Sequence, residues 1–578
     1  MEEPQMQLLE EILSGWIRDC FTNTWPDVAQ EMSKVVVTQT TTSEFGEYQC
    51  NAAMSFSKML KKSPRDIAQA VITGNRLHES LERAEIAGPG FINLHLRSDW
   101  LARRVEAVAA DERLGVPDVG GGRTIVMDYG SPNMSKPLHI GHLRSPNIGS
   151  ALDKIHRFLG YNVVADNHLG DWGTQFGITI MGYRNFGNKQ AMIDAPMEEL
   201  QRVYTESFAR GETDDAWRNQ CRQELVKLQA GDPDNMALWK EFMELSLQEV
   251  GRTYERLGVK YDLVRGESYY NDRLQGVVDL LVQKGMARES EGALVVFLDD
   301  EKLPPVIVRK KDGGFNYMTT DLATVMSRVE EFKPCKILYL TDERQQLHFK
   351  QLFTICGKLG IDVKLEHSWF GLMRLPEGTF STRKGTVISL EKLLDESEER
   401  ALAVVREQSP DMEPERQKQI AKAVGLGAVK YADLSQNPQS LVVFTWEKAL
   451  ALNGNSAPYL QYAFARIASV KDKLRERYPD VDLSKHPIQL IDPVEKGLAV
   501  KVARFPETLV RVTENCKPNI LTDYLYELAQ AYSTYYQNVP FLKAPDGVRE
   551  SRVRLCGIVA QVLQKGLDLL GITTPDRI

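Results

Sequence analysis

The sequence contains little cysteine and no long apolar run. Its 578 residues include seven cysteines, which are scattered along the chain and never form a Cys-x-x-Cys pair. This pattern argues against a disulfide framework and against a cysteine-bound zinc ion, and it favours a reducing compartment, the cytoplasm. No apolar stretch reaches the roughly 18 residues that would cross a bilayer, and the acidic start MEEPQMQLLEEIL lacks the pattern of a secretory signal, so we expect no membrane association.

Two glycine-rich nucleotide signatures are also missing. Neither Gly-x-Gly-x-x-Gly nor Gly-x-x-x-x-Gly-Lys-Ser/Thr follows a predicted strand, so a dinucleotide-binding fold and a P-loop lose their main support. The sequence has no His-Glu-x-x-His helix either, and no third ligand accompanies its histidine pair. We therefore expect no protein-bound metal.

The charge balance is acidic overall but uneven along the chain. The chain carries 71 basic and 79 acidic residues, a net charge of −8, which taken alone would discourage binding to nucleic acid. Residues 1–120 hold 12 basic and 18 acidic side chains, whereas residues 401–578 hold 23 and 20. Any affinity for RNA should therefore come from local patches, chiefly in the last third of the chain, and should weaken as salt rises.

The length suggests about three or four domains, and the patterns along the chain divide it into three. Residues 1–118 mix helical patterns with short strands, and the triple glycine 120–122 follows as a linker. From 119 to 390, apolar strand-like runs alternate with helices, which is typical of an α/β core of Rossmann type with a parallel sheet. The candidate strands are 124–127, 163–165, 294–297, 306–308 and 337–340, and a charged helical insertion is expected at about 183–258. Residues 391–578 predict a helical bundle, with helices at 416–434, 446–478, 493–514, 520–537 and 549–570.

The first predicted core strand leads into a loop with two histidines and then a helix. His139 and His142 lie three residues apart, and hence on one helical face, with Gly141 between them. A helix N-terminus is a favourable place for an anion, imidazole N–H groups can donate to phosphate oxygens, and glycine lets a flat ring approach the backbone. From the local pattern alone, a chance pair of histidines or half of a metal site explains the two residues as well as an anion site does.

Several blocks make the chain similar to one enzyme family. The segment Pro137-Leu138-His139-Ile140-Gly141-His142 resembles the HIGH motif of class I aminoacyl-tRNA synthetases, and its flanks resemble the arginyl-tRNA synthetase form of that motif. Four further segments are similar to blocks of the same family, namely 167–177, 425–434, 454–463 and 570–578. The resemblance thus runs in order along essentially the whole chain.

This resemblance implies a function and an architecture. It implies an α+β N-terminal domain that binds tRNA, a Rossmann-type catalytic core and an all-α anticodon-binding bundle. The enzyme would activate L-arginine with ATP and substrate-bound Mg²⁺ to arginyl-adenylate, and then transfer arginyl to tRNA(Arg). A monomer in the cytoplasm is expected. The alternatives are another class I synthetase or HIGH-type nucleotidylyltransferase, and a non-catalytic RNA-binding scaffold derived from a synthetase.

The resemblance assigns catalytic residues to two segments. His139 and His142 would stabilise the phosphate, with Gly141 beside the nucleotide. The segment that corresponds to the second class I motif contains Arg383 and Lys384, and an extra lysine of the family corresponds to Lys136. Which of these three cations contacts pyrophosphate stays open.

The arginine pocket can be argued from charge. A guanidinium is a planar cation with a fork of donors, so its pocket needs carboxylates and benefits from an aromatic wall. Tyr317 and Asp321 lie four residues apart at the start of a helical pattern, although an N-terminal cap at Thr320 or Asp321 and core packing of Tyr317 are the commoner explanation of this pattern taken alone. The resemblance assigns them to arginine together with Ser131, Asn133, His142 and Gln345, and Asp128 and Glu267 are further carboxylate candidates.

Two regions are candidates for RNA contact. In the N-terminal domain the resemblance points to Gly88, Phe91 and Asn93, for which a turn glycine and a packed strand are the competing interpretation. In the bundle it points to Tyr459, Tyr462 and Arg466, on a helix that combines aromatic and basic side chains. Because aromatic residues at helical spacing are often core residues, we expect only some of these to face RNA.

Overall fold

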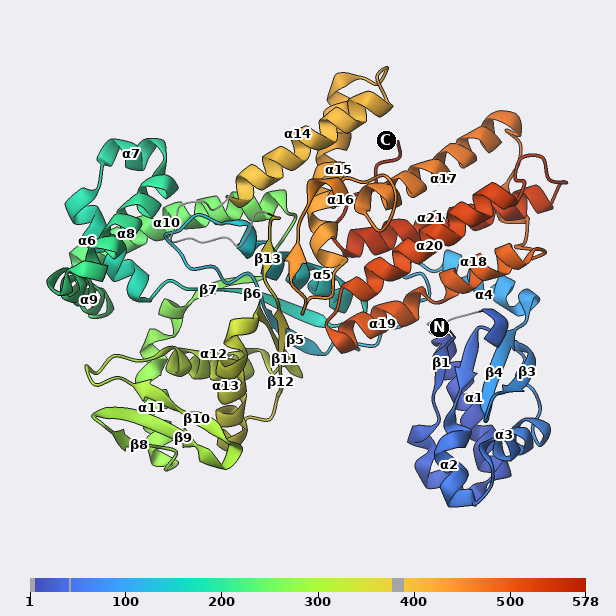
Figure 1. Ribbon diagram of the computed structural model, residues 1–578, viewed down its shortest axis with the longest axis horizontal. Coiled ribbons are helices and arrows are strands. Elements are labelled where there is room, and N and C mark those ends of the chain that lie inside the picture. Colours follow the sequence, from blue (N-terminus) through green and yellow to red (C-terminus); the bar gives the residue numbers. More distant parts are fainter. Residues whose placement is uncertain (1–5, 41–42, 377–388, 578) are drawn as a thin grey trace.

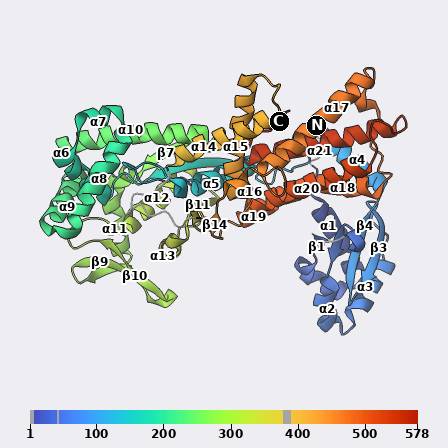
Figure 2. The same ribbon diagram turned by 45° about the horizontal axis from the view of Figure 1, so that its top comes forward.

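The computed structural model describes residues 6–40, 43–376 and 389–577. Arg383 and Lys384 therefore lie outside the described residues. The molecule is elongated, with the N-terminal unit and a helical insertion at opposite ends and the parallel sheet between them (Figures 1 and 2). Among the described residues, no helix is both long enough and apolar enough to span a bilayer. The seven cysteines are all free thiols, and six of them are buried.

The N-terminal unit is a small antiparallel sheet covered by helices. Its strands are β1 (Val37–Gln39), β2 (Tyr48–Cys50), β3 (Leu81–Ala87) and β4 (Phe91–Leu96), in the order β1-β2-β4-β3. The helices are α1 (Leu9–Thr24), α2 (Ala52–Leu60) and α3 (Pro64–Thr73). Helix α4 (Ser98–Ala110) then leads the chain to the C-terminal bundle (Figure 1).

The central sheet has five parallel strands in the order β12-β11-β5-β6-β7. The strands are β5 (Thr124–Asp128), β6 (Asn162–Leu169), β7 (Leu263–Gly266), β11 (Lys336–Asp342) and β12 (Lys364–Phe370), connected by helices that include α5 (Arg144–Phe158), α12 (Tyr317–Phe332) and α13 (Gln346–Leu359). Because β5 pairs with β6 on one side and with β11 on the other, the connections leave the sheet in opposite directions there. The carboxyl ends of these strands border the crevice where ligands bind in such sheets.

Two strands expected in the parallel sheet lie elsewhere. The predicted strands 294–297 and 306–308 form β9 (Ala293–Leu298) and β10 (Leu303–Arg309), which pair antiparallel with each other, while β8 (Ala287–Ser290) completes a separate sheet. Assigning them to the core was therefore wrong. A tight turn around the left-handed Lys302 joins β9 to β10, and much of the outer face of β10 is exposed, as in a hairpin with one solvated face.

Five helices form the insertion between β6 and β7. They are α6 (Thr174–Phe186), α7 (Lys189–Asp194), α8 (Pro196–Thr213), α9 (Asp215–Gln229) and α10 (Pro233–Arg256). They enclose an apolar cluster of their own around Phe176, Leu200 and Phe242. The insertion is thus a packed helical layer at one end of the molecule (Figure 2).

The C-terminal region is helical, as the sequence predicts, but two of the predicted helices are each divided in two. Its helices are α14 (Leu390–Gln408), α15 (Pro414–Leu434), α16 (Trp446–Ala449), α17 (Ala457–Arg477), α18 (Pro493–Ala503), α19 (Phe505–Asn515), α20 (Asn519–Asn538) and α21 (Val548–Leu569). The left-handed Gly454 and the N-cap Ser456 separate α16 from α17. Pro506 in the first turn of α19 separates it from α18.

A buried carboxylate joins the N-terminal unit to this bundle. Glu507 on α19 accepts hydrogen bonds from the Glu10 backbone N–H at 2.9 Å, from Gln39 Nε2 at 2.7 Å and from the Tyr48 hydroxyl at 3.1 Å. Burial, and then the charge of Glu10, raise the pKa of Glu507 to about 7. The contact between the two units is therefore sensitive to the charge of one side chain.

Candidate active site

A cleft of about 760 Å³ opens at the carboxyl ends of β5, β6 and β11. The structure brings most of the predicted arginine and nucleotide residues together in its lining: Asp128, Ser131, Asn133, His139, Gly141, His142, Glu267, Tyr317, Asp321 and Gln345. These residues come from four separate stretches of the chain: 128–142, 267, 317–321 and 345. The cleft is therefore the candidate active site.

The two histidines lie in a short 3-10 turn, η3 (Ile140–His142), rather than on the face of an α-helix. His139 is the N-cap of this turn, and the ring centroids of the two histidines are 3.9 Å apart. The backbone N–H of His139 donates to Nδ1 of His142 at 3.0 Å, and the N–H of Gly141 donates to Nδ1 of His139 at 3.1 Å. Since each Nδ1 accepts a hydrogen bond, the proton of each neutral ring is on Nε2, where it can donate to a ligand.

Burial and neighbouring positive charge keep both rings neutral. The pKa of His139 is lowered to about 4, first by burial and then by Lys136. The pKa of His142 is lowered to about 3 by burial, by His139 and by Lys136. Lys136 Nζ itself lies 3.9 Å from the centroid of the Tyr204 ring on insertion helix α8, a cation–π contact.

The loop after β5 is joined to the loop after β6. The Gly170 backbone N–H donates to the Pro132 carbonyl and the Met134 N–H donates to the Gly170 carbonyl, both at 3.1 Å. Ser131 has a left-handed backbone with φ +47°, and its N–H donates to Asn167 Oδ1 at 2.9 Å. These bonds fix the positions of Ser131 and Asn133 in the lining of the cleft.

Asp128 lines the cleft but is engaged by other protein groups. The buried Arg328 on α12 donates from Nη2 to Asp128 and to Asp166, each at 2.7 Å. Ser131 Oγ donates to the same Asp128 side chain at 2.7 Å. Burial would lower the pKa of Arg328, but Asp128 and Asp166 outweigh it and the pKa is raised. The geometry thus gives Asp128 a role in holding Ser131 and Arg328.

An acidic wall with an aromatic edge faces the cleft from α12. Asn316, rather than Thr320 or Asp321, caps this helix, because its Oδ1 accepts the Tyr317 N–H at 3.0 Å. The Tyr317 side chain is left 56% exposed in the cleft, one turn from Asp321. Asp321 Oδ2 lies 2.5 Å from His348 Nε2 on α13. The aromatic ring and the carboxylate are therefore both available to a ligand.

Glu267, at the start of η4 (Glu267–Arg273), is the second carboxyl group of this wall. Burial, then the charges of Asp321 and Asp171, raise its pKa to about 8, so the carboxyl is largely protonated at neutral pH while the cleft holds no cation. A cationic ligand would favour its ionised form. Glu267 can therefore supply a second negative charge when a cation binds.

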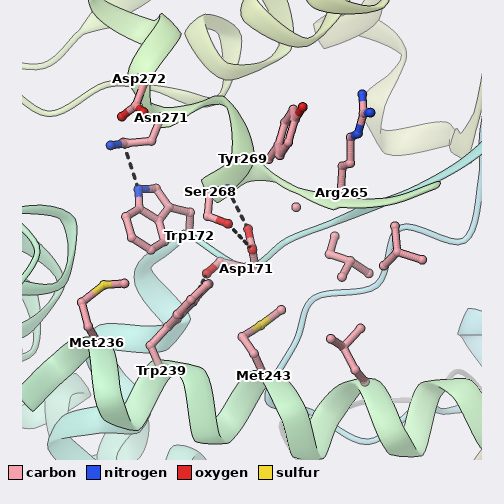
Figure 3. Close-up of a pocket in the computed structure, with 14 residues that line it drawn as sticks. Asp171, Trp172, Met236, Trp239, Met243, Arg265, Ser268, Tyr269, Asn271 and Asp272 are labelled. Atoms are coloured by element: carbon pink, nitrogen blue, oxygen red, sulfur yellow. Dashed lines mark hydrogen bonds between the residues drawn. The ribbon is translucent and has the colours of Figure 1, made fainter.

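A second cavity, of about 420 Å³, is lined by Gly266 and Ser268, the two chain neighbours of Glu267 (Figure 3). In its lining, Ser268 donates to Asp171 from its backbone N–H at 2.9 Å and from Oγ at 2.6 Å. The indole of Trp239 donates to the Asp171 carbonyl at 2.8 Å and that of Trp172 to Asn271 at 3.2 Å. These hydrogen bonds between the lining residues fix the backbone on either side of Glu267.

The cleft therefore has two chemically different sides. One side presents the Nε2–H groups of His139 and His142, which suit phosphate oxygens. The other presents Asp321, Glu267 and the Tyr317 ring, which suit a guanidinium. The arrangement fits a nucleotide and a cationic amino acid bound next to each other.

The predicted RNA contacts lie in the N-terminal unit and in the bundle, outside the lining of this cleft, and the structure exposes them unequally. Gly88 is exposed at the β3–β4 turn and Phe91 is half-buried beside it. Asn93 is only 2% exposed, and its Oδ1 accepts a hydrogen bond from Gln49 at 2.7 Å. Its amide is thus turned into the sheet rather than toward a base edge, because the strand alternation places it against β2.

In the bundle, the predicted RNA residues form an aromatic and basic cluster. Tyr462 is 42% exposed, and the Arg466 guanidinium lies 4.8 Å from its ring centroid and 5.2 Å from that of Tyr536. Tyr459 is half-buried, and its hydroxyl lies 3.3 Å from Ser533 Oγ. The exposed surface is thus centred on Tyr462 and Arg466.

His348 is a cleft residue that the sequence analysis missed. It lies three residues after Gln345, so the two share one side of the chain where α13 begins. That spacing could have identified His348 from the sequence. The pairing of His348 with Asp321 was not visible in the sequence, because the two residues lie on different helices.

Comparison with protein families matches almost the whole chain. The model of the class I tRNA synthetase (R) catalytic domain matches residues 104–446, that of the DALR anticodon binding domain matches residues 460–578, and that of the arginyl tRNA synthetase N-terminal domain matches residues 7–96.

Individual proteins agree with these models. The chain is 43% identical to the arginine–tRNA ligase of Fusobacterium nucleatum, with 98% of each chain covered, and 44% identical to that of Chromobacterium violaceum, again with 98% of each covered. Its fold is similar to the arginyl-tRNA synthetase structures of Plasmodium falciparum (TM-score 0.84, 24% identity, 100% of both chains) and Thermus thermophilus (TM-score 0.82, 24% identity, 99% and 100%).

Proposed function

The chain belongs to the arginyl-tRNA synthetase family of class I aminoacyl-tRNA synthetases, and from this membership we propose how its cleft binds and activates arginine. As an arginine–tRNA ligase it is an AMP-forming enzyme of protein synthesis. Enzymes of this family act on arginine, ATP and tRNA. The assignment of residues to these substrates is our proposal.

The guanidinium of arginine would bind at the acidic wall. Asp321 and Glu267 would accept its N–H donors, and the Tyr317 ring would cover its face. Ser131 and Asn133, fixed by the joined loops, would bind the α-amino and carboxylate end, with Gln345 at the rim. This orientation is supported by one observation: the acidic wall and the two Nε2–H donors lie on different sides of the cleft.

ATP would lie along the histidine side of the cleft. The arginine carboxylate attacks the α-phosphate, so negative charge grows on the phosphoryl oxygens while pyrophosphate departs. His139 and His142 would donate their Nε2–H groups to these oxygens, and the turn at Gly141 leaves room for the nucleotide. Lys136, Arg383 and Lys384 are the proposed cations for pyrophosphate. Mg²⁺ would enter on the ATP phosphates and neutralise part of their charge.

The remaining assignments concern tRNA and the arrangement of the chain. We assign residues 1–118 and 391–578 to tRNA(Arg) binding and residues 119–390, with the insertion at about 183–258, to catalysis. Tyr462 and Arg466, together with Tyr459, would bind the anticodon arm, and Gly88 and Phe91 the body of the tRNA. We further propose a monomer in the cytoplasm with no protein-bound metal.

Arginine-dependent ATP–pyrophosphate exchange, with and without tRNA(Arg), tests the proposal. Exchange that requires arginine, and that is reduced at least tenfold by His142→Ala, is the expected result. No exchange with arginine under either condition would contradict it.

A further inference from the structure

His348 occupies a position in the cleft that the assignments above leave without a role. Its Nε2 lies 2.5 Å from Asp321 Oδ2, and the two side chains are 28% and 24% exposed. It lies in the first turn of α13, three residues after Gln345, whereas Asp321 lies on α12. The imidazole thus connects the two helices that enclose this side of the cleft.

We propose that His348 is a positioning residue for arginine: its Nε2–H fixes the Asp321 carboxylate for the guanidinium, and a proton leaves this imidazole when arginine binds. The inference rests on the proposed binding of arginine at Asp321.

The positioning part follows from geometry. A carboxylate on a flexible side chain can rotate, and each orientation presents different lone pairs. The short bond to His348 holds one oxygen of Asp321 and so fixes the plane of the group, leaving Oδ1 and the second lone pair of Oδ2 for a planar fork of N–H donors. The Phe349 ring packs nearly perpendicular to the imidazole, with ring centroids 5.5 Å apart, and limits its movement.

The proton release follows from charge. Burial alone would lower the pKa of His348, but the hydrogen bond to Asp321 and the charge of Asp321 outweigh it, and the pKa is raised above its ordinary value. An imidazolium there neutralises Asp321 and would repel an arriving guanidinium. Loss of the Nδ1 proton to solvent removes the repulsion, and the neutral ring keeps its Nε2–H on Asp321.

Other titratable groups surround this pair. His367 on β12 has its pKa lowered to about 4, by burial above all, so it is neutral across the working range. Asp342, at the end of β11, is paired with Arg344 of η6 (Glu343–Gln345). Glu267 on η4, whose pKa is raised to about 8, is a second titrating group, and its contribution must be measured separately.

The experiment uses the full-length enzyme without tRNA. Calorimetric titration with L-arginine in two buffers of different ionisation heat, between about pH 6 and about pH 8, gives the number of protons released per arginine bound. His348→Gln places an amide N–H near the position of Nε2 but cannot titrate. We expect it to bind arginine within about threefold of wild type at the upper pH, and to release fewer protons at the lower pH.

Two further variants separate position from charge. His348→Leu removes the donor and should weaken arginine binding about tenfold at the upper pH, where His348 of the wild type is neutral, without changing the KM for ATP in the complete aminoacylation reaction. Glu267→Gln should abolish the protons that Glu267 releases on arginine binding and leave those that His348 releases. His367→Gln is the matched control, because this histidine bonds to Thr341 and does not contact Asp321; it should behave as wild type.

Several results would overturn the proposal. Full wild-type proton release in His348→Gln would exclude the proton step, and wild-type affinity in His348→Leu would exclude positioning. If wild-type enzyme showed no binding heat with arginine and no arginine-dependent exchange, the proposed substrate site itself would be wrong. Normal arginine binding by the wild type, with unchanged proton release in His348→Gln and unchanged affinity in His348→Leu, would reject only the role of His348.

Discussion

Arg144 Nε donates to Asp433 Oδ1 at 2.7 Å, and both side chains are almost completely buried. Arg144 begins the helix that follows the histidine turn, whereas Asp433 lies near the end of α15. Arg144 Nη1 also donates to the Gly371 carbonyl at 2.5 Å. The pair therefore ties the catalytic turn to the C-terminal helices.

Asp433→Ala should destabilise the enzyme strongly, because it leaves the Arg144 guanidinium buried without a counter-charge. Removing one partner of a buried pair costs about 3–5 kcal/mol. The first urea-unfolding transition measures the change. Glu396→Ala, which removes an exposed partner of Arg400 on α14, is the control and should cost about 0.5 kcal/mol or less. Equal losses in the two variants would contradict the role of burial.

Gly141→Ala should lower the rate of arginine activation without unfolding the protein. A Cβ at Gly141 would lie 2.8 Å from His139 Cε1 and 2.9 Å from its Nδ1, so the His139 ring must move. We expect arginine-dependent pyrophosphate exchange to fall about 10–100-fold, with little change in melting temperature. Gly251→Ala, at a position on α10 where a Cβ meets no atom within 4 Å, should keep wild-type exchange. Normal exchange in Gly141→Ala would show that the ring position does not matter.

Asp321→Asn should raise the KM for arginine by about 10–100-fold, because a neutral amide replaces the carboxylate that accepts the guanidinium. The KM for ATP should stay within about twofold, since the histidine side of the cleft is unchanged. Steady-state aminoacylation with each substrate varied gives both constants, and the exposed Asp362→Asn serves as the control. An equal rise in both KM values would reject the assignment of the acidic wall.

Glu507→Gln should flatten the pH dependence of stability. The folded-state pKa of Glu507 is about 7, above the ordinary value of 4.5, so between these values the folded state holds a proton that the unfolded state has lost. Stability from this group is therefore complete below about pH 4.5 and falls as pH rises to about 7, by about 3 kcal/mol.

Melting temperatures between about pH 5 and about pH 8 test this expectation, and Glu507→Gln should lose less stability than wild type over that range. The exposed Glu527→Gln on α20, where the wild-type glutamate pairs with Lys501, is the control and should follow the wild-type slope. A Glu507→Gln slope equal to wild type would show that this carboxyl does not titrate in the interface.

Tyr462→Ala should weaken binding of tRNA(Arg) by about 5–100-fold, the range expected for loss of one base-stacking platform. Tyr462→Phe keeps the ring over Arg466 and should bind as wild type. Arg466→Ala should also weaken binding and should reduce its salt dependence, because one phosphate contact is lost. Filter binding at two salt concentrations measures all three variants. An equal loss of tRNA(Arg) affinity in Tyr462→Ala and Tyr462→Phe would show that base stacking on the ring is not the cause of the loss.

Local pattern predicted the parts of the site that are close in sequence. The histidine turn was visible because His139, Gly141 and His142 are neighbours, and Tyr317 and Asp321 were visible because they lie one helical turn apart. The antiparallel pairing of β9 and β10 was not, because short apolar runs look alike in a parallel core and in a hairpin.

Contacts between distant segments were beyond prediction from one sequence. Arg328 reaches Asp128 from a helix 200 residues further along the chain, which changes that carboxylate from a free group into a paired one. Tyr204 meets Lys136 from the insertion, and His348 meets Asp321 from the next helix. Each contact joins side chains whose proximity depends on the whole fold.

The order of strands in the central sheet has a consequence for how the enzyme is made. Strand β5, at the centre, can pair with β6 soon after β6 is synthesised. Its other neighbour, β11, begins only at Lys336. At about 5–20 residues per second, one edge of β5 stays unpaired for roughly 10–40 s on the ribosome. The enzyme that supplies arginine for translation should therefore itself be vulnerable to aggregation during its own synthesis, and should gain from chaperones that cover exposed strand edges.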